Sequence, residues 1–377
     1  MITADQILPS IYHLQRLGVV GKIAVCARRS LTLETLASNP ELSAAFPGAA
    51  FDAAPGRFQD AIAAMSVRQV VIVAVPDAQH HEVVMESLRR GHHVICVKPL
   101  AQRHRHGEEI AALAYDAGLF VGVEYHKRFD RRALVARGLY REGRLGAFVM
   151  GEARLHEPYA YRHSNFQNWF TCDQADPFTY IGCHYVDLVH FITGLNPTAV
   201  SVDAVKGAFP NGNEGYLWSS ARVRFENDAL LTVTNGLGYP DDAAGSNDQG
   251  LVMYCEGPGR TGMINHDDHE RGVRYAFVET GGHPRYRYVS PDYFRLVPWE
   301  GEGSRPVGYG YDSIEALIVA VRRVDAAPGL ADRRVAIKNI DAAGLLATPA
   351  NSAFNEQLVE AARVSIARGG ENVRLDG

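Results

Sequence analysis

Residues 71–101, VIVAVPDAQHHEVVMESLRRGHHVICVKPLA, decide the fold of this chain. The stretch begins inside QVVIVAV (69–75), an almost wholly apolar run that predicts a strand buried on both faces of a parallel sheet. Asp77–Arg90 has helical spacing and stops at Gly91, a residue that often ends a helix. His93–Val97 (HVICV) is a second strand. The stretch therefore predicts a strand–helix–strand unit with parallel strands.

The segments on either side extend the same alternation. We expect two more strands, Lys22–Cys26 and Leu119–Val123. We also expect four more helices, at 4–18, Ser30 to about Ala45, His104–Ala117 and Phe129–Arg141. Alternation at this pace predicts an α/β, doubly wound parallel sheet.

After about Leu145 the pattern changes to longer alternating segments, which predict an α+β domain with a large, mostly antiparallel sheet. Its expected strands are Phe148–Leu155, Ala199–Val205, Trp218–Phe225, Leu230–Asn235, Leu251–Cys255 and Val273–Val278. Its expected helices are Phe178–Thr193, Ser313–Val324 and Ser352–Ala367. We therefore expect two domains, 1–143 and 144–377, with the last helices packing back on the first.

Composition narrows the class of protein. The net charge of −5 gives no overall field that would attract nucleic acid or an anionic membrane. No run of 18 apolar residues occurs, so we expect no membrane-spanning helix. The five scattered cysteines indicate reduced thiols in a cytoplasmic protein. No histidine or cysteine spacing matches a zinc site, and no G-x-S-x-G elbow of a serine hydrolase is found, so we expect neither.

Ligands of open parallel sheets bind at the carboxyl ends of the strands. Three such ends carry distinctive residues, namely Val75-Pro76-Asp77, Val97-Lys98-Pro99 and Glu124-Tyr125-His126.

The stretch 71–101 resembles the signature of the Gfo/Idh/MocA oxidoreductases, and the resemblance continues through VGVEYHKRFD (121–130) and GCHYVDLVHFITG (182–194). It implies a Rossmann-like domain that binds NAD(P) and a second domain that binds a carbohydrate-like small molecule. The implied reaction moves a hydride between nicotinamide and a secondary alcohol of a sugar, cyclitol or sugar derivative. Resemblance also implies a homo-oligomer, a dimer or tetramer.

The same resemblance implies catalytic roles for Lys98 and His184. Lys98 polarises the reacting oxygen and contacts the cofactor, while His184 handles the hydroxyl proton, a task that suits imidazole near neutral pH. Tyr180 lies one helical turn before His184, where the family often has aspartate, and could take part in proton relay. Two further positions depart from the family, because Asp77 replaces asparagine and Val97 replaces glutamate.

Arginine follows the second strand of the fold at positions where NAD-specific domains have a carboxylate. Arg28 and Arg29 suit a 2′-phosphate, so we expect NADP or NAD with a preference for NADP. The expected cofactor contacts are Arg28, Arg29, Val75, Pro76, Asp77, His80, Lys98, Pro99, Glu124 and His126.

The loop 159–173 mixes hydrogen-bonding groups with flat apolar ones, which suits sugar rings. The expected substrate contacts are His126, Arg162, His163, Asn165, Asn168, Trp169, Tyr180, His184 and Asp187.

A dinucleotide-binding domain should open with a strand and G-x-G-x-x-G, but this sequence opens with the helix that follows them. We expect that the start was assigned at an internal methionine, with roughly 10–15 natural residues upstream. The alternative is a chain that lacks them and binds dinucleotide weakly. Two other functions stay open: glycoside cleavage or elimination through transient oxidation by tightly bound NAD(H), and non-catalytic sugar binding or regulation.

Overall fold

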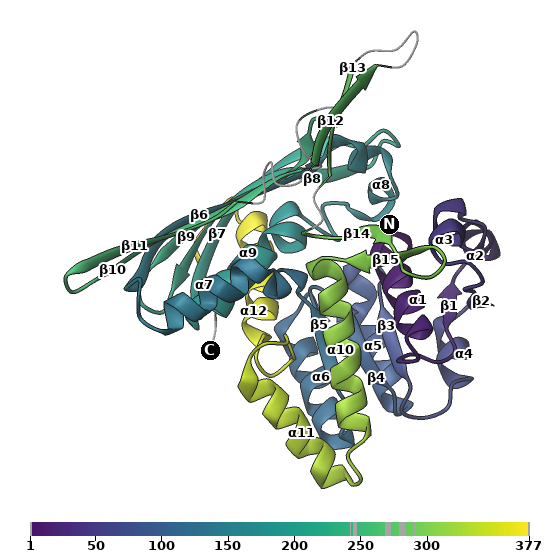
Figure 1. Cartoon of the computed structure of the whole chain (residues 1–377). Coiled ribbons are helices and arrows are strands. Elements are labelled where there is room, and N and C mark those ends of the chain that lie inside the picture. Colours follow the sequence, from purple (N-terminus) through teal and green to yellow (C-terminus); the bar gives the residue numbers. More distant parts are fainter. Residues whose placement is uncertain are drawn as a thin grey trace.

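The computed structural model describes residues 2–241, 243, 247–267, 273–278, 284–289 and 292–375. These residues form two lobes (Figure 1). The first lobe is built on short parallel strands between helices, and the second on one large twisted sheet.

Two small parallel sheets form the first lobe. In one, β1 (Ala24–Ala27) pairs with β2 (Asp52–Pro55). In the other, β4 (His93–Val97) lies between β3 (Val70–Val73) and β5 (Val121–Glu124). The strands of the second sheet are parallel, and their connections run through α5 (His80–Arg89) and α6 (His104–Ala117), as the sequence predicts.

A gap separates the two sheets, and it corresponds to a strand position of the Rossmann fold. That fold has the strand order 3-2-1-4-5-6, and the order here is β2-β1, a gap, and β3-β4-β5. No described residue fills the central position. Instead α1 (Leu8–Arg16) packs on both sheets, with Ile11 and Leu14 toward β4 and with Leu8 and Tyr12 toward β1.

Two sequence predictions for this lobe are wrong. The run 69–75 is not buried on both faces, because β3 covers only Val70–Val73 and three of its four residues are half-buried at the edge of the gap. The predicted helix from Ser30 to Ala45 is two helices, α2 (Ser30–Ala37) and α3 (Pro40–Ala45), because Asn39 caps the second one before Pro40. A short helix, α4 (Phe58–Ala63), follows β2.

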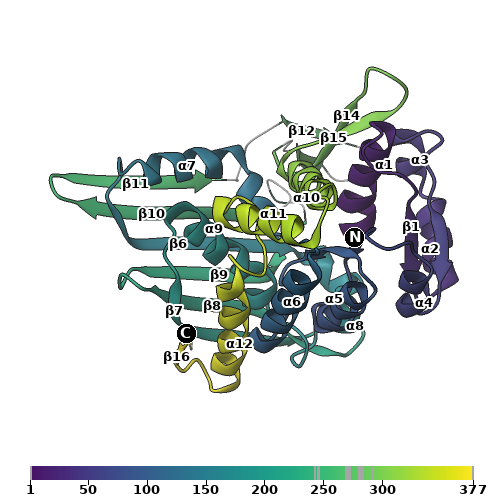
Figure 2. The same ribbon diagram turned by 90° about the horizontal axis from the view of Figure 1, so that it is seen from below.

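The second lobe is a seven-stranded sheet in the order β11-β10-β6-β9-β8-β7-β16. All its pairings are antiparallel except that of β6 with β9. One face packs on helices and the other faces outward (Figures 1 and 2). The strands are β6 (Ala147–Pro158), β7 (Pro197–Ala208), β8 (Glu214–Phe225), β9 (Leu230–Tyr239), β10 (Asp248–Gly257), β11 (Arg260–Asp267) and β16 (Val373–Arg374).

Helices α7 (Arg131–Arg141), α9 (Cys183–Thr193) and α12 (Ala353–Ala367) cover the inner face of this sheet. Their core includes Phe148, Phe178, Tyr185, Phe191 and Leu358, which are all buried. A short helix, α8 (Phe166–Trp169), lies in the loop after β6. Two further hairpins pair β12 (Val273–Val278) with β13 (Pro284–Val289) and β14 (Arg295–Pro298) with β15 (Ser304–Val307).

The chain then returns to the first lobe. α10 (Tyr309–Asp325) packs on β5 and α1, and α11 (Leu330–Ala343), which the sequence analysis missed, packs on α10 and α6. Figure 1 shows both helices below the large sheet, with α6 beside them. Residues from both ends of the chain therefore complete the core of the first lobe.

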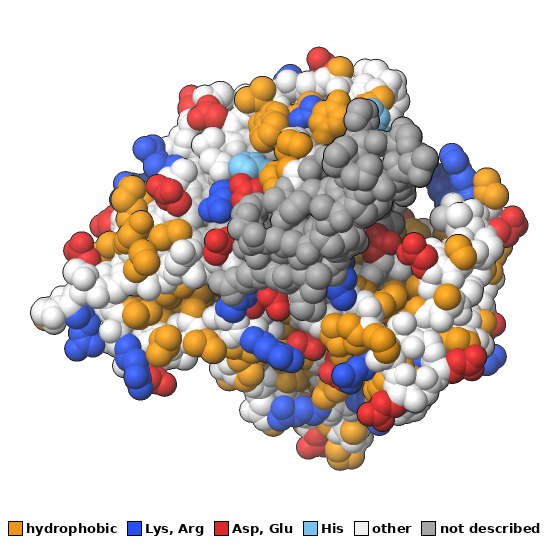
Figure 3. All heavy atoms as spheres, turned by 45° about the horizontal axis from the view of Figure 1, so that its top comes forward, with side chains coloured by type: hydrophobic (Ala, Val, Ile, Leu, Met, Phe, Trp, Pro, Cys, Tyr) orange, Lys and Arg blue, Asp and Glu red, His pale blue; other side chains and the backbone are white. Residues whose placement is uncertain are grey.

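Positive and negative side chains alternate over the face in Figure 3, in agreement with the small net charge. Among the described residues, no helix is long and apolar enough to cross a membrane.

Candidate active site

The carboxyl ends of β3, β4 and β5 meet the first turn of α9 where the two lobes touch. Lys98 follows β4, Glu124 ends β5, and His126 lies two residues farther on. His184 is the second residue of α9, directly after the π-helical turn η5 (Phe178–Gly182). The structure thus brings together Lys98, His126, Tyr180 and His184, which the sequence analysis had singled out from three separate segments.

Tyr180 holds Lys98 through its backbone and its ring. The Lys98 ammonium donates a hydrogen bond to the main-chain carbonyl of Tyr180. Its nitrogen lies 3.7 Å from the centre of the Tyr180 ring, a cation–π contact. The ring packs in turn on Phe166, Trp169 and Phe170. The ring of Tyr180, at the position where the family often has an aspartate, therefore holds Lys98 in place as part of an aromatic cluster.

His80 ties two strand ends together. Its Nδ1 lies 2.7 Å from the carbonyl oxygen of Pro99, and its Nε2 lies 2.9 Å from that of Val75. The ring is fully buried, so it braces the turns after β3 and β4. Asp77, also buried, lies beside His80 and Lys98, and burial raises the pKa of its carboxyl group.

His184 is buried beside His126, with ring centres 4.6 Å apart. Its Nδ1 atom has no hydrogen-bond partner among the described residues. Burial, followed by the nearby His126, Lys98 and Lys127, lowers the pKa of His184 well below its usual value. The neutral form of the imidazole is therefore favoured.

A carboxylate supports His126. The Nδ1 atom of His126 lies 3.1 Å from Oε2 of Glu124, and the other carboxylate oxygen accepts hydrogen bonds from Gln6 Nε2 (3.1 Å) and Ser313 Oγ (2.7 Å). The sequence analysis missed Gln6 and Ser313. They lie 118 and 189 residues from Glu124, so no local pattern pointed to them.

Two more residues that the sequence analysis missed lie beside the site, Glu157 in the second lobe and Lys127 in the segment after β5. Glu157, near the end of β6, accepts a hydrogen bond from Asn247 at 3.4 Å. Burial raises the pKa of Glu157, opposed by that bond and by the charges of Lys127 and Lys98. Lys127 is buried and donates to Gln249 Oε1 at 2.5 Å.

Asp187 lies behind the site rather than in it. Its carboxylate accepts two hydrogen bonds from Arg128, at 2.6 and 2.8 Å, and a third from Asn355 at 2.9 Å. Both members of the Asp187–Arg128 ion pair are about 2% exposed. These bonds join α9 to α12 and to the segment after β5, so they position His126 and His184 instead of facing a substrate.

The predicted specificity loop is divided between two environments. Trp169 packs on Tyr180, and the Arg162 guanidinium donates to the Leu237 carbonyl and lies over the Tyr159 and Trp218 rings. By contrast His163, Asn165 and Asn168 are exposed. Asn168 bonds to Asn165 and Asn211 instead.

The reacting end of a nicotinamide dinucleotide fits these residues. Lys98 supplies a cation, and the unpartnered Nδ1 of His184 supplies a buried polar atom that a ligand can satisfy. Arg28 and Arg29 are exposed directly after β1, free to meet the far end of the dinucleotide. The described residues contain no glycine loop to hold the pyrophosphate.

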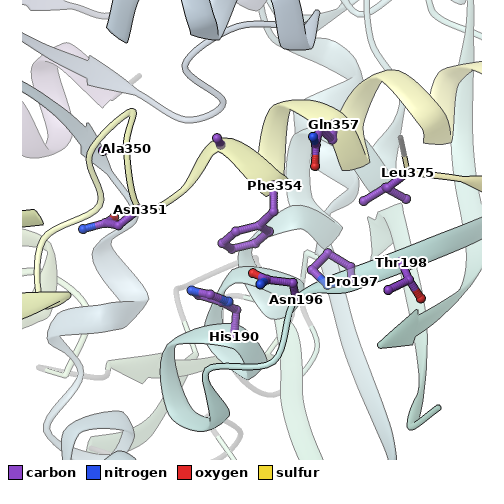
Figure 4. A pocket seen from close by; sticks show the side chains of 10 residues that line it. His190, Asn196, Pro197, Thr198, Ala350, Asn351, Phe354, Gln357 and Leu375 are labelled. Atoms are coloured by element: carbon purple, nitrogen blue, oxygen red, sulfur yellow. The ribbon is translucent and has the colours of Figure 1, made fainter. Parts of the chain in front are cut away.

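Among the described residues, no three or more His, Cys, Asp or Glu side chains are grouped so that they could hold a metal ion. A hollow of about 540 Å³ lies between the end of α9 and the start of α12, lined by His190, Asn196 and Phe354 among others (Figure 4). None of the predicted site residues lines it.

Comparison with known proteins agrees with this architecture. Residues 7–125 match the model of the oxidoreductase family with an NAD-binding Rossmann fold, and residues 134–257 match the GFO/IDH/MocA C-terminal domain. Of curated proteins, the chain is 30% identical over 165 residues to 1,5-anhydro-D-fructose reductase of Ensifer adhaerens, covering 42% of this chain and 48% of that protein. It is 31% identical over 140 residues to scyllo-inositol 2-dehydrogenase (NADP(+)) IolW of Bacillus subtilis, covering 36% and 38%.

The chain thus spans less than two thirds of the length of these curated relatives. Of solved structures, it is similar to scyllo-inositol dehydrogenase from Lactobacillus casei with bound NAD(H) and scyllo-inositol, at a TM-score of 0.61 and 14% identity over 94% of this chain and 91% of that one. That likeness confirms the predicted fold class, a Rossmann-like domain followed by a large mostly antiparallel sheet. With both of its halves matched by the family's models, the chain belongs to the GFO/IDH/MocA oxidoreductase family.

Proposed function

We propose that the chain is an NAD(P)-dependent oxidoreductase that acts on a secondary alcohol of a sugar, cyclitol or sugar derivative. The observation that carries the proposal is the convergence of Lys98, His126 and His184 at the carboxyl ends of β4 and β5. One cation and two imidazoles at the sheet edge suit the oxidation of an alcohol, which needs a polarised oxygen and a proton acceptor.

The bound nicotinamide supplies hydride chemistry, and the protein supplies orientation and proton handling. Lys98 faces the reacting oxygen, and a neighbouring imidazole takes the hydroxyl proton. The ring of Tyr180 keeps Lys98 in place, and Trp169 extends that apolar surface toward the substrate loop. Within that loop we propose Arg162 as a substrate contact, because it bonds to Leu237 of β9.

We propose NADP as the preferred cofactor, because Arg28 and Arg29 can pair with a 2′-phosphate and no carboxylate lies beside them in sequence. The substitutions Arg28→Ala and Arg29→Ala should weaken NADP⁺ binding and leave NAD⁺ binding nearly the same. Calorimetry with both nucleotides measures this ratio.

The test of activity is a panel assay with purified protein. myo-Inositol, scyllo-inositol, 1,5-anhydro-D-glucitol and simple glucosides are offered with NAD⁺ or NADP⁺, and formation of reduced nicotinamide is followed by absorbance. Lys98→Met is the matched inactive variant. Turnover that Lys98→Met abolishes supports the proposal. A protein that binds neither NAD⁺ nor NADP⁺ would instead favour a non-catalytic sugar-binding protein. Size-exclusion chromatography on the same sample tests the proposed homo-oligomer.

A further inference from the structure

The residues after β5 form a carboxylate–imidazole pair that faces the site. Glu124 is 1% exposed, and three donors converge on its two oxygens: Gln6, Ser313 and His126. This arrangement suits the ionised carboxylate, which can only accept hydrogen bonds. A carboxylate beside Nδ1 favours the tautomer that carries its hydrogen there, which leaves the lone pair of the His126 ring on Nε2.

The ring of His126 is held from several sides. It stacks on Tyr309 of α10 with ring centres 5.6 Å apart, and it lies 5.2 Å from the Tyr293 ring and 4.6 Å from the His184 ring. The side chain is 14% exposed, so solvent and ligand reach it from one direction only. An imidazole oriented by a carboxylate and packed in this way has the geometry of a general base.

His184 lacks this support. No acceptor or donor contacts its Nδ1 atom among the described residues, and the position one turn earlier, residue 180, carries a tyrosine ring that is occupied by Lys98. The cations around it oppose a further positive charge on His184. Of the two imidazoles, His126 alone has a carboxylate beside it among the residues that the structure describes.

We propose that His126, oriented by Glu124, is the catalytic base of this enzyme, and that His184 orients the substrate oxygen. The inference rests on the proposed function and assigns its proton-accepting step. In the oxidising direction the alcohol O–H bond breaks and its proton goes to Nε2 of His126. The carbinol C–H bond breaks with its electron pair passing to nicotinamide C4, and the second C–O bond of the ketone forms.

The first experiment needs no substrate. Protein labelled with ¹⁵N-histidine gives long-range ¹H–¹⁵N spectra that report which ring nitrogen carries the hydrogen, and His126→Gln assigns the His126 signals. We expect hydrogen on Nδ1 and a lone pair on Nε2 in the wild type, and loss of this preference in Glu124→Gln. A lone pair on Nδ1 in the wild type would overturn the proposal.

Glu109→Gln is the matched control. It breaks a similar carboxylate–imidazole contact, His81 Nε2 to Glu109 Oε2 at 3.0 Å, on the surface between α5 and α6. This variant should change the His81 signals and leave those of His126 as they are.

The second experiment uses the alcohol of the panel that is turned over fastest. His126→Gln should lower kcat by about 10²- to 10⁴-fold and remove the rise of kcat with pH that a base gives. His184→Gln should raise KM more than it lowers kcat and keep that rise. In His126→Gly, added imidazole should restore part of the activity, which a merely structural role for His126 would not allow.

The groups that face His126 come from several elements: Glu124 from β5, His184 from α9, Tyr309 from α10, Tyr293 from the segment before β14, and its chain neighbour Lys127. Among substitutions of these neighbours, Glu124→Gln alone should reproduce the pH profile of His126→Gln. If His184→Gln abolishes the rise with pH while His126→Gln keeps it, the assignment is wrong. Absence of turnover and of nucleotide binding would count against the proposed function, and the tautomer measurement would still decide the Glu124–His126 pair.

Discussion

The Lys98 ammonium lies 3.7 Å from the centre of the Tyr180 ring and also donates to the Tyr180 main-chain carbonyl. The tyrosine hydroxyl takes part in neither contact. Tyr180→Leu should therefore weaken the hold on Lys98 by about 2 kcal/mol, a factor of about 30 in kcat/KM, because the cation–π contact is lost. Tyr180→Phe keeps the ring and should lose less than about threefold. A Tyr180→Phe variant as impaired as Tyr180→Leu would instead assign a proton-relay role to the hydroxyl.

The buried ion pair behind the site should dominate the stability of this region. Asp187→Asn leaves the Arg128 charge buried with a neutral partner, and should lower the free energy of unfolding by roughly 3–5 kcal/mol. Urea denaturation followed by circular dichroism measures the change.

The control for that measurement is Asp228→Asn. Asp228 pairs with Arg224 at 3.2 Å, but their side chains are 90% and 47% exposed, so the loss should stay within about 1 kcal/mol. Equal losses in the two variants would mean that Asp187 and Arg128 contribute no more than a surface pair.

A buried carboxyl on α12 should make stability depend on pH. Burial raises the pKa of Glu356 to about 8, although the peptide groups of Glu356, Leu100 and Ala101 act in the opposite direction. Between about pH 4 and that value the folded chain keeps a proton that the unfolded chain has released. The contribution of Glu356 to the free energy of unfolding is therefore fully present below its pKa in the unfolded chain. It falls as the pH rises toward the pKa in the folded chain, by about 1.4 kcal/mol per pH unit at most.

Glu356→Gln removes this titration. Relative to the wild type, the variant should gain stability steadily from pH 5 to pH 8 in thermal unfolding experiments. Glu360→Gln, one turn later on the exposed side of α12, serves as the control and should run parallel to the wild type. Parallel profiles for Glu356→Gln as well would contradict the assignment of a protonated Glu356.

The gap between β1 and β3 should accept an added strand. Apolar side chains at its edges are half-buried, including Ile23, Val25, Val70 and Ile72. An engineered N-terminal extension that supplies an apolar strand and a G-x-G turn should raise the melting temperature. It should also lower the Kd for NADP⁺ at least about tenfold, because peptide N–H groups then reach the pyrophosphate.

An extension with the same strand but valine in place of both glycines separates the two effects. It should keep the gain in stability and lose the gain in affinity, since a side chain keeps the phosphates from the backbone. Calorimetry and thermal unfolding on the three proteins provide the comparison. No change in either quantity would mean that α1 already closes the gap.

Local patterns predicted much of the fold. The period of the helix over 77–90 and the apolar run of His93–Val97 depend on neighbours in sequence, and α5 and β4 lie where those patterns indicate. α11 was missed because only Ile337 and Ile340 of its residues are buried, so it shows little apolar periodicity.

The candidate site was predicted in part for the same reason. Strand ends are visible in sequence, so Lys98, Glu124 and His126 could be named, but what surrounds them could not. Ser313 and Gln6 reach Glu124 only through the folding of distant segments. The role of Asp187 likewise depends on Arg128 and Asn355, which no spacing connects to it.

The return of α10 to the first lobe has a consequence for the synthesis of the chain. Ile314 and Leu317 of α10 cover Ile95 and Phe120, and the isolated bridge from Val123 to Ala347 extends the edge of β5. About 200 residues separate that strand from its cover, which takes on the order of 10–40 s at ordinary rates of translation. During that time the nascent sheet presents its apolar side to solvent or to a chaperone, and His126 gains its packed surroundings only after α10 has left the ribosome.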